Sequence, residues 1–140
     1  QKEVTSLRYR ESAAMKTLRS ILLLLFLTTL SALAQNDRMV PVRFAPGASS
    51  ATVVEGIPRG DTSTFVLEAA AGQRMRIVCD SVEDNAEFDV ISPGGWELGH
   101  SRPKNGRQVW YAELPHNGAY HVIVGTTRGG AEATITFEIW

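Results

Sequence analysis

The fold of this chain is decided by residues 64–95, which read TFVLEAAAGQRMRIVCDSVEDNAEFDVISPGG. Two apolar-rich runs at residues 65–69 and 75–79 flank a turn of small residues at 70–73, and a third run at 88–91 leads into a Ser-Pro-Gly-Gly turn. Short β-type runs that are separated by turn residues at regular intervals are typical of an antiparallel sandwich or barrel. This stretch therefore predicts an all-β protein.

One of these runs shows how the strands are expected to bury their side chains. Apolar Met75, Ile77 and Cys79 alternate with a second set that we expect on a solvated face, namely Arg74, Arg76, Val78 and Asp80. A period of two indicates a strand with one face in the core and the other in water. The expected strand is half-buried.

The same spacing of short runs and turns continues through the rest of the chain, and no window has a sustained helical apolar stripe. We expect loops at 100–106, as a long hairpin, and at 125–131, which is rich in glycine. Because the apolar faces must cover each other, the predicted fold is an antiparallel β-sandwich of about eight strands. The expected strands are residues 39–44, 52–57, 65–69, 73–80, 88–91, 96–98, 108–114, 119–124 and 134–140.

The N-terminal part has the three-part pattern of a secretory signal. Within residues 15–34, a short basic start after Met15 precedes an apolar core, and small residues end the segment at Ala34. A membrane anchor is the alternative, but the apolar core is about half of the roughly 20 residues that a spanning helix needs. We predict that residues 1–14 are an upstream extension, that residues 15–34 are removed, and that 35–140 form a single periplasmic or secreted domain.

The composition of residues 35–140 excludes some partners. Of 14 basic and 15 acidic residues, five basic and two acidic ones precede residue 35, which leaves 9 and 13, a net charge of −4. Mild acidity without a basic cluster argues against nucleic acid or an anionic membrane surface. Cys79 is the only cysteine, so no intramolecular disulfide can form. We expect Cys79 to be buried; the alternative is an intermolecular disulfide.

Catalytic and metal-binding motifs are not found in the sequence. It has no nucleophile elbow, P-loop or dinucleotide fingerprint, and no histidine lies beside the Ser49–Ser50 pair, so we expect a protein that is not an enzyme and has no cofactor. No metal site is predicted, because the histidines have no metal-ligand spacing and the acidic residues around 80–89 fit no defined calcium loop. We interpret these acids as a solvated turn, with calcium binding as the alternative. They are Asp80, Glu83, Asp84, Glu87 and Asp89, and the histidines are His100, His116 and His121.

Three aromatic residues leave two interpretations open. Trp96, Trp110 and Tyr111 could form one platform for a sugar or a protein. Alternation of aromatics along strands more often reflects packing, so we favour core rings with one exposed ring.

Several short segments carry a resemblance to known proteins. They are VRFAPGASS at 42–50, residues 53–60, AAAGQ at 69–73, FDV at 88–90, LPHNGAY at 114–120 and the last strand. Together they resemble the periplasmic inhibitors of goose-type lysozyme and the wider bacterial pre-peptidase C-terminal type of β-sandwich, over nearly all of residues 42–139.

The resemblance implies a small secreted binding protein. In the inhibitor family, a loop between the last two strands carries arginines into the lysozyme cleft, and a tyrosine from the third strand assists. The matching loop here is 125–131, in which Arg128 matches the first arginine, with Thr127 and Gly129 beside it, and Phe65 stands at the tyrosine position. The loop is shorter and lacks the later arginines.

The implied partner is a lysozyme-like hydrolase. The alternative is a non-catalytic structural or carbohydrate-binding module, for which the partner would be a cell-wall glycan. We expect no nucleic-acid partner and no stable membrane insertion once the signal has been removed.

Overall fold

The structure is a computed structural model that describes residues 36–102 and 107–140. The predicted extension and signal, residues 1–34, lie outside the described residues. Within the described ranges the chain forms nine strands, and none of it forms a helix that could cross a membrane. The strands are β1 (Asp37–Pro41), β2 (Ser50–Ile57), β3 (Thr62–Ala69), β4 (Arg74–Ser81), β5 (Ala86–Ile91), β6 (Glu97–Ser101), β7 (Arg107–Glu113), β8 (Gly118–Thr126) and β9 (Ala131–Ile139).

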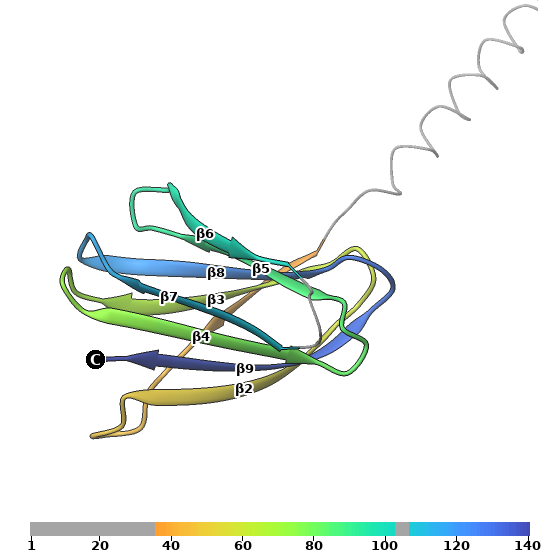
Figure 1. Cartoon of the computed structure of the whole chain (residues 1–140), viewed down its shortest axis with the longest axis horizontal. Coiled ribbons are helices and arrows are strands. Elements are labelled where there is room, and N and C mark those ends of the chain that lie inside the picture. Colours follow the sequence, from red (N-terminus) through yellow and green to blue (C-terminus); the bar gives the residue numbers. More distant parts are fainter. Residues whose placement is uncertain (1–35, 103–106) are drawn as a thin grey trace, which may run out of the picture. The chain divides into compact units, whose positions relative to one another are not determined.

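The strands form two sheets that pack face to face (Figure 1). One sheet has the order β1-β3-β8-β5-β6, and the other has the order β2-β9-β4-β7. All neighbours are antiparallel except β1 and β3, which pair in parallel. The predicted all-β sandwich is confirmed. β1 is an edge strand that ends at Pro41, as expected for a residue that cannot donate to a ladder.

The core lies between the sheets and is built by the period-two alternation of the strands. Its largest fully buried side chains include Phe65 of β3, Phe88 of β5, Tyr120 of β8 and Phe137 of β9. Phe65 and Phe137 come from opposite sheets, and their ring centroids lie 5.4 Å apart at 46°. A contact of this kind is a favourable tilted aromatic pair, and it ties the two layers together.

Cys79 and Val78 are neighbours on β4, and both are buried. The burial predicted for Cys79 is confirmed. The solvated position predicted for Val78 is wrong, because β4 is a central strand on which Val109 of β7 and Thr136 of β9 flank Val78 in the ladder. Cross-strand neighbours on both sides cover a side chain even on the outer face of a sheet.

The connection from β6 to β7 also differs from its prediction. The hairpin expected over 100–106 is wrong, because β6 belongs to the five-stranded sheet and β7 to the four-stranded sheet. The chain therefore crosses from one layer to the other here, and residues 103–106 of this connection lie outside the described residues.

The β3–β4 turn, residues 70–73, and the β7–β8 turn, residues 114–117, lie at one end of the sandwich and are linked by hydrogen bonds. The Leu114 amide donates to the Gln73 carbonyl over 2.7 Å, and the Ala71 amide donates to Oδ1 of Asn117 over 2.8 Å. The Tyr120 hydroxyl donates to the carbonyl of His116 and accepts from its amide, at 2.6 and 3.0 Å. β8 starts at this end, so the β8–β9 loop lies at the opposite end of the sandwich.

Candidate functional site

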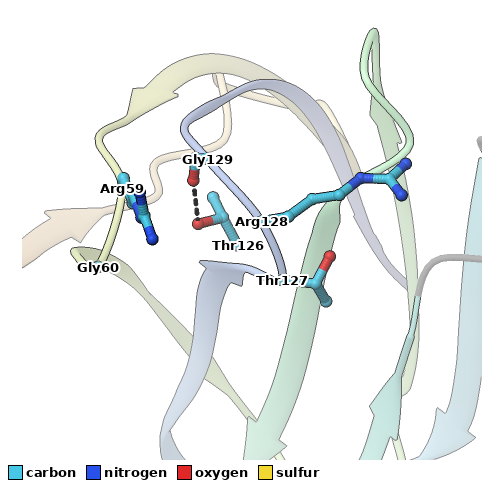
Figure 2. A pocket seen from close by; sticks show the side chains of 6 residues that line it. All are labelled: Arg59, Gly60, Thr126, Thr127, Arg128 and Gly129. Carbon is cyan, nitrogen blue, oxygen red and sulfur yellow. Dashed lines mark hydrogen bonds between the residues drawn. The ribbon is translucent and has the colours of Figure 1, made fainter.

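Three connections meet at that opposite end. They are the β2–β3 turn at 58–61, the β4–β5 loop at 82–85 and the β8–β9 loop at 127–130 (Figure 2). They come together because β2, β4 and β8 all run toward this end of the sandwich. Hydrogen bonds and close backbone packing join the loops, so the end of the sandwich forms one continuous surface.

The β8–β9 loop is shorter than the sequence suggests. β8 continues through Gly125 and Thr126, whose ladder partners are Glu87 and Ala86 of β5, and β9 begins at Ala131. The connection is therefore residues 127–130 rather than 125–131. Glycine at 125 does not end the strand, because its neighbour β5 supplies ladder hydrogen bonds there. Gly129 has a φ of 68°, in the left-handed region that a tight turn uses.

Asn85 fixes the β8–β9 loop by hydrogen bonds. Its Nδ2 donates to the carbonyl oxygens of Arg128 and Gly130, at 2.6 and 2.7 Å. The backbone carbonyl oxygen of Asn85 accepts from the Thr127 amide at 2.9 Å and from the Thr127 hydroxyl at 3.3 Å. Asn85 is only 2% exposed. One buried residue thus fixes the backbone on both sides of Arg128.

The β4–β5 loop fixes Asn85 in turn. The Ser81 hydroxyl oxygen accepts from the amides of Asn85 and Ala86, at 3.1 and 3.2 Å. Asp84 has a φ of 48°, a conformation that aspartate tolerates better than most residues. The acids of this segment were predicted to form a solvated turn, and the role of Asn85 was not predicted from the sequence. The available signal was an asparagine at the end of a turn, directly before a strand.

Arg128, Thr127 and Gly129 are exposed, which places three of the predicted site residues on one loop. The Arg128 side chain extends toward the β4–β5 loop, as Figure 2 shows, and its Nη2 donates to the carbonyl oxygen of Glu83 at 3.4 Å. No carboxylate of the described residues forms an ion pair with Arg128. The guanidinium group is held loosely by one carbonyl and keeps most of its donors available.

Phe65, the fourth residue that the resemblance implied, lies elsewhere. Its side chain is fully buried between the sheets against Phe137. The reason is the register of β3, which points Phe65 into the core together with Leu67. Phe65 has no surface that a partner could touch while the sandwich is intact, so we leave it out of the site.

An open hollow of about 500 Å³ lies between the β2–β3 turn and the β8–β9 loop. Arg59, at the tip of the β2–β3 turn, lines it on one side, and Arg128 belongs to its other side (Figure 2). Arg59 was not predicted from the sequence, because nothing local to the turn indicates which loop lies next to it. The complete lining is Arg59, Gly60, Thr126, Thr127, Arg128 and Gly129.

The three aromatic residues considered as a platform do not share a surface. Trp110 and Tyr111 are consecutive on β7 and point to opposite faces; Trp110 packs half-buried against the core. Trp96 is 65% exposed, and its ring lies 6.0 Å from that of His116. Tyr111 is 53% exposed and stacks on Trp140, with centroids 5.9 Å apart. The favoured prediction of one exposed ring is therefore also incomplete, because two are exposed.

Several charged groups outside the loop end pair with each other. Arg102 pairs with Glu87 at 3.3 Å and with Asp89 at 2.9 Å, and the hydrogen bond that Arg102 donates to Asp89 is the main factor that raises the pKa of Arg102. His100 lies 2.9 Å from Glu97. Within the described ranges, no three side chains of the types that bind metals gather at one point.

Fold and exposed residues together define a class: a small β-sandwich domain in which two exposed arginines, Arg59 and Arg128, stand on neighbouring loops at one end. No protein-family model matches the sequence, and a search of curated proteins finds no match. Solved structures, by contrast, do match this fold.

The crystal structure of Aeromonas hydrophila PliG, a periplasmic lysozyme inhibitor of g-type lysozyme, is similar to this chain. The two are 28% identical with a TM-score of 0.69, over 76% of this chain and 100% of PliG. A mutant of the Escherichia coli PliG has 21% identity and a TM-score of 0.58, over 75% of this chain and 100% of the mutant. The pre-peptidase C-terminal domain of a Bacillus anthracis collagenase has 11% identity and a TM-score of 0.52, over 76% and 96%. The latter two show the shared fold, and the expected resemblance to both groups is confirmed.

Proposed function

We propose that this protein is a periplasmic or secreted inhibitor of g-type lysozyme, or of a related hydrolase, and that the β8–β9 loop binds the cleft of the enzyme. The observation that carries the proposal is the position of Arg128. It is exposed and unpaired with any carboxylate of the described residues, and it stands on a loop that Asn85 holds in place. The 28% identity to Aeromonas hydrophila PliG, over the whole length of that chain, supports the choice of target. The location follows from the predicted signal at residues 15–34.

The physical reason lies in the charge of the target. Glycoside hydrolases use a pair of carboxylic acid side chains at the scissile bond, so their clefts carry negative charge. A guanidinium group matches the geometry of a carboxylate and can donate two parallel hydrogen bonds to it. Because the backbone beside Arg128 is already fixed, less conformational entropy is lost when the loop binds.

The proposal is tested by a turbidity assay with goose-type lysozyme acting on bacterial cells, with the purified protein in micromolar excess. The wild-type protein should protect the cells, and Arg128→Ala should weaken inhibition about 30-fold or more, as expected for an anchor residue in an interface. Arg74→Ala is the matched control, because Arg74 is also exposed but lies at the start of β4, at the far end of the sandwich. Full inhibition by Arg128→Ala would show that the site is wrong.

The alternative is a glycan-binding module, and the exposed pair Tyr111 and Trp140 favours it. Aromatic faces suit the apolar side of sugar rings. The same protein preparation distinguishes the two functions. Absence of protection against lysozyme together with sedimentation on insoluble peptidoglycan would replace the inhibitor proposal with the glycan-binding one.

A further inference from the structure

We infer that Arg59 and Arg128 form a two-arginine site for carboxylates, so that the β2–β3 turn supplies a second cationic contact to the partner. The class of ligand, a surface with two separate carboxylates, follows from the described residues. Its identification with the cleft of a lysozyme rests on the proposed function.

The backbone places Arg59 at an exposed position beside the loop. The β2–β3 turn is closed by a hydrogen bond of 3.1 Å from the Asp61 amide to the Pro58 carbonyl, and Gly60 has a φ of 84°. Arg59 occupies the tip of this turn and is exposed. Proline before it and left-handed glycine after it restrict the backbone on both sides.

Close packing fixes this turn against the β8–β9 loop. A Cβ atom on Gly130 would lie 3.1 Å from the Ile57 carbonyl oxygen and 3.7 Å from the Arg59 nitrogen. The two chain segments therefore approach each other as backbone against backbone. Asn85 fixes the carbonyl of the same Gly130 from the other side. The relative position of the two arginine backbones is thus built into the fold before any ligand arrives.

Both guanidinium groups lack an internal carboxylate. Within residues 36–102 and 107–140, no carboxylate pairs with Arg59 or Arg128, in contrast to Arg38, Arg76 and Arg102. Other described arginines also lack an ion pair, but they do not line the hollow; they are Arg43, Arg74 and Arg107. None of the residues that line the hollow is acidic. Two positive charges on one open hollow, with no negative charge among its lining residues, attract an anion over a distance of about 10 Å at ordinary salt.

The hydrogen bonds of the hydroxyl groups in the hollow favour an anion over a neutral sugar as the ligand. The Thr126 hydroxyl donates to the Gly129 carbonyl at 2.8 Å (Figure 2), and the Thr127 hydroxyl donates to the Asn85 carbonyl. Since a hydroxyl has one proton to donate, both are already used within the protein. The side-chain donors that remain among the lining residues are those of the guanidinium groups, and these prefer carboxylates.

The two side chains extend in different directions. Figure 2 shows Arg128 running toward the β4–β5 loop, while Arg59 lies on the other side of the 126–129 segment. This arrangement favours a separate carboxylate for each guanidinium group over one carboxylate shared by both. The site therefore suits two carboxylates that are held apart, as in the paired acids of a glycosidase cleft.

The first arm of the test needs no lysozyme. The purified full chain is titrated with citrate while the side-chain Nε–H signals of its arginines are followed by NMR. The signals of Arg59 and Arg128 should shift with one common saturation curve, Arg59→Gln should weaken the response of Arg128 at least threefold, and Arg74 should not respond. Shifts of Arg128 without Arg59 would overturn the inference.

The second arm measures the dissociation constant for goose-type lysozyme at two salt concentrations. Arg59→Gln should raise the constant about tenfold at low salt and reduce its salt dependence, whereas Arg74→Gln should change neither. Binding that is unaffected by Arg59→Gln would refute the two-arginine site and leave the inhibitor proposal intact. Citrate binding to both arginines without any binding of lysozyme would support the site and refute the inhibitor proposal.

Discussion

Replacing Asn85 by alanine tests how the protein presents Arg128. The substitution deletes two hydrogen bonds from Nδ2, of 2.6 Å to the Arg128 carbonyl and 2.7 Å to the Gly130 carbonyl. Each such bond contributes about 0.5–1.5 kcal/mol net. Both bonds are half-buried rather than fully buried, so the full penalty for buried unpaired groups does not apply. Asn85 Oδ1 has no hydrogen-bond partner among the described protein atoms, so its removal costs nothing further. We expect a loss of about 1–3 kcal/mol in the free energy of unfolding.

The assay combines urea unfolding, followed by tryptophan fluorescence, with hydrogen exchange of the Thr127 amide, which donates to the Asn85 backbone carbonyl. Asn85→Asp should cost more than Asn85→Ala, because a carboxylate would face two carbonyl oxygens. Asn117→Ala is the matched control: Asn117 makes one hydrogen bond to the Ala71 amide at the opposite end of the sandwich. It should cost about 0.5–1.5 kcal/mol and leave exchange in the β8–β9 loop unchanged.

Two results would refute the role assigned to Asn85. One is a loss of stability below about 0.5 kcal/mol with unchanged exchange at Thr127. The other is that the effects of Asn85→Ala and Arg128→Ala on lysozyme binding are additive. If Asn85 acts by positioning Arg128, the double variant with Arg128→Ala should bind no more weakly than Arg128→Ala does by itself.

Two further predictions concern the core and the far end of the sandwich. Burial, with a smaller contribution from Asp80, raises the pKa of Cys79 from 9.0 to about 12. The native thiol should therefore resist labelling by a disulfide reagent at pH 8. Because the unfolded chain loses this proton before the folded one does, the free energy of unfolding should fall above pH 9, by up to about 1.4 kcal/mol per pH unit. Rapid labelling of the native protein would contradict this. Tyr120→Phe should cost about 1–3 kcal/mol in urea unfolding, because it leaves the His116 backbone groups without the hydroxyl partner, and should not change lysozyme binding. Unchanged stability would show that this hydroxyl is unimportant.

The interior of the sandwich could be predicted from the sequence because it depends on a local rule. Side chains on a strand alternate between faces, so Ile77 and Cys79 on β4, like Val122 and Val124 on β8, must share a face wherever the strand lies. Turn residues mark the ends of such strands. These two local signals were enough for the fold class and for the exposed position of Arg128 in the last loop.

The candidate site depends on pairings between distant parts of the chain, and the tertiary structure decided them. Arg59 lies beside Arg128 because β2 and β8 end together, and Asn85 reaches the loop from more than 40 residues away. The crossing from β6 to β7 likewise depends on which sheet each strand joins, and no local pattern specifies that.

Phe65 shows the difference between what the local sequence pattern determines and what the tertiary structure decides. Its alternation with Leu67 and Ala69 already indicated a common face, whereas its match to a family tyrosine suggested contact with a partner. In the structure it packs on Phe137 in the core. The local period of two determined which side chains share a face. Only the packing of one sheet on the other decided that this face is closed to a partner, and that the loops at the end of the sandwich are open.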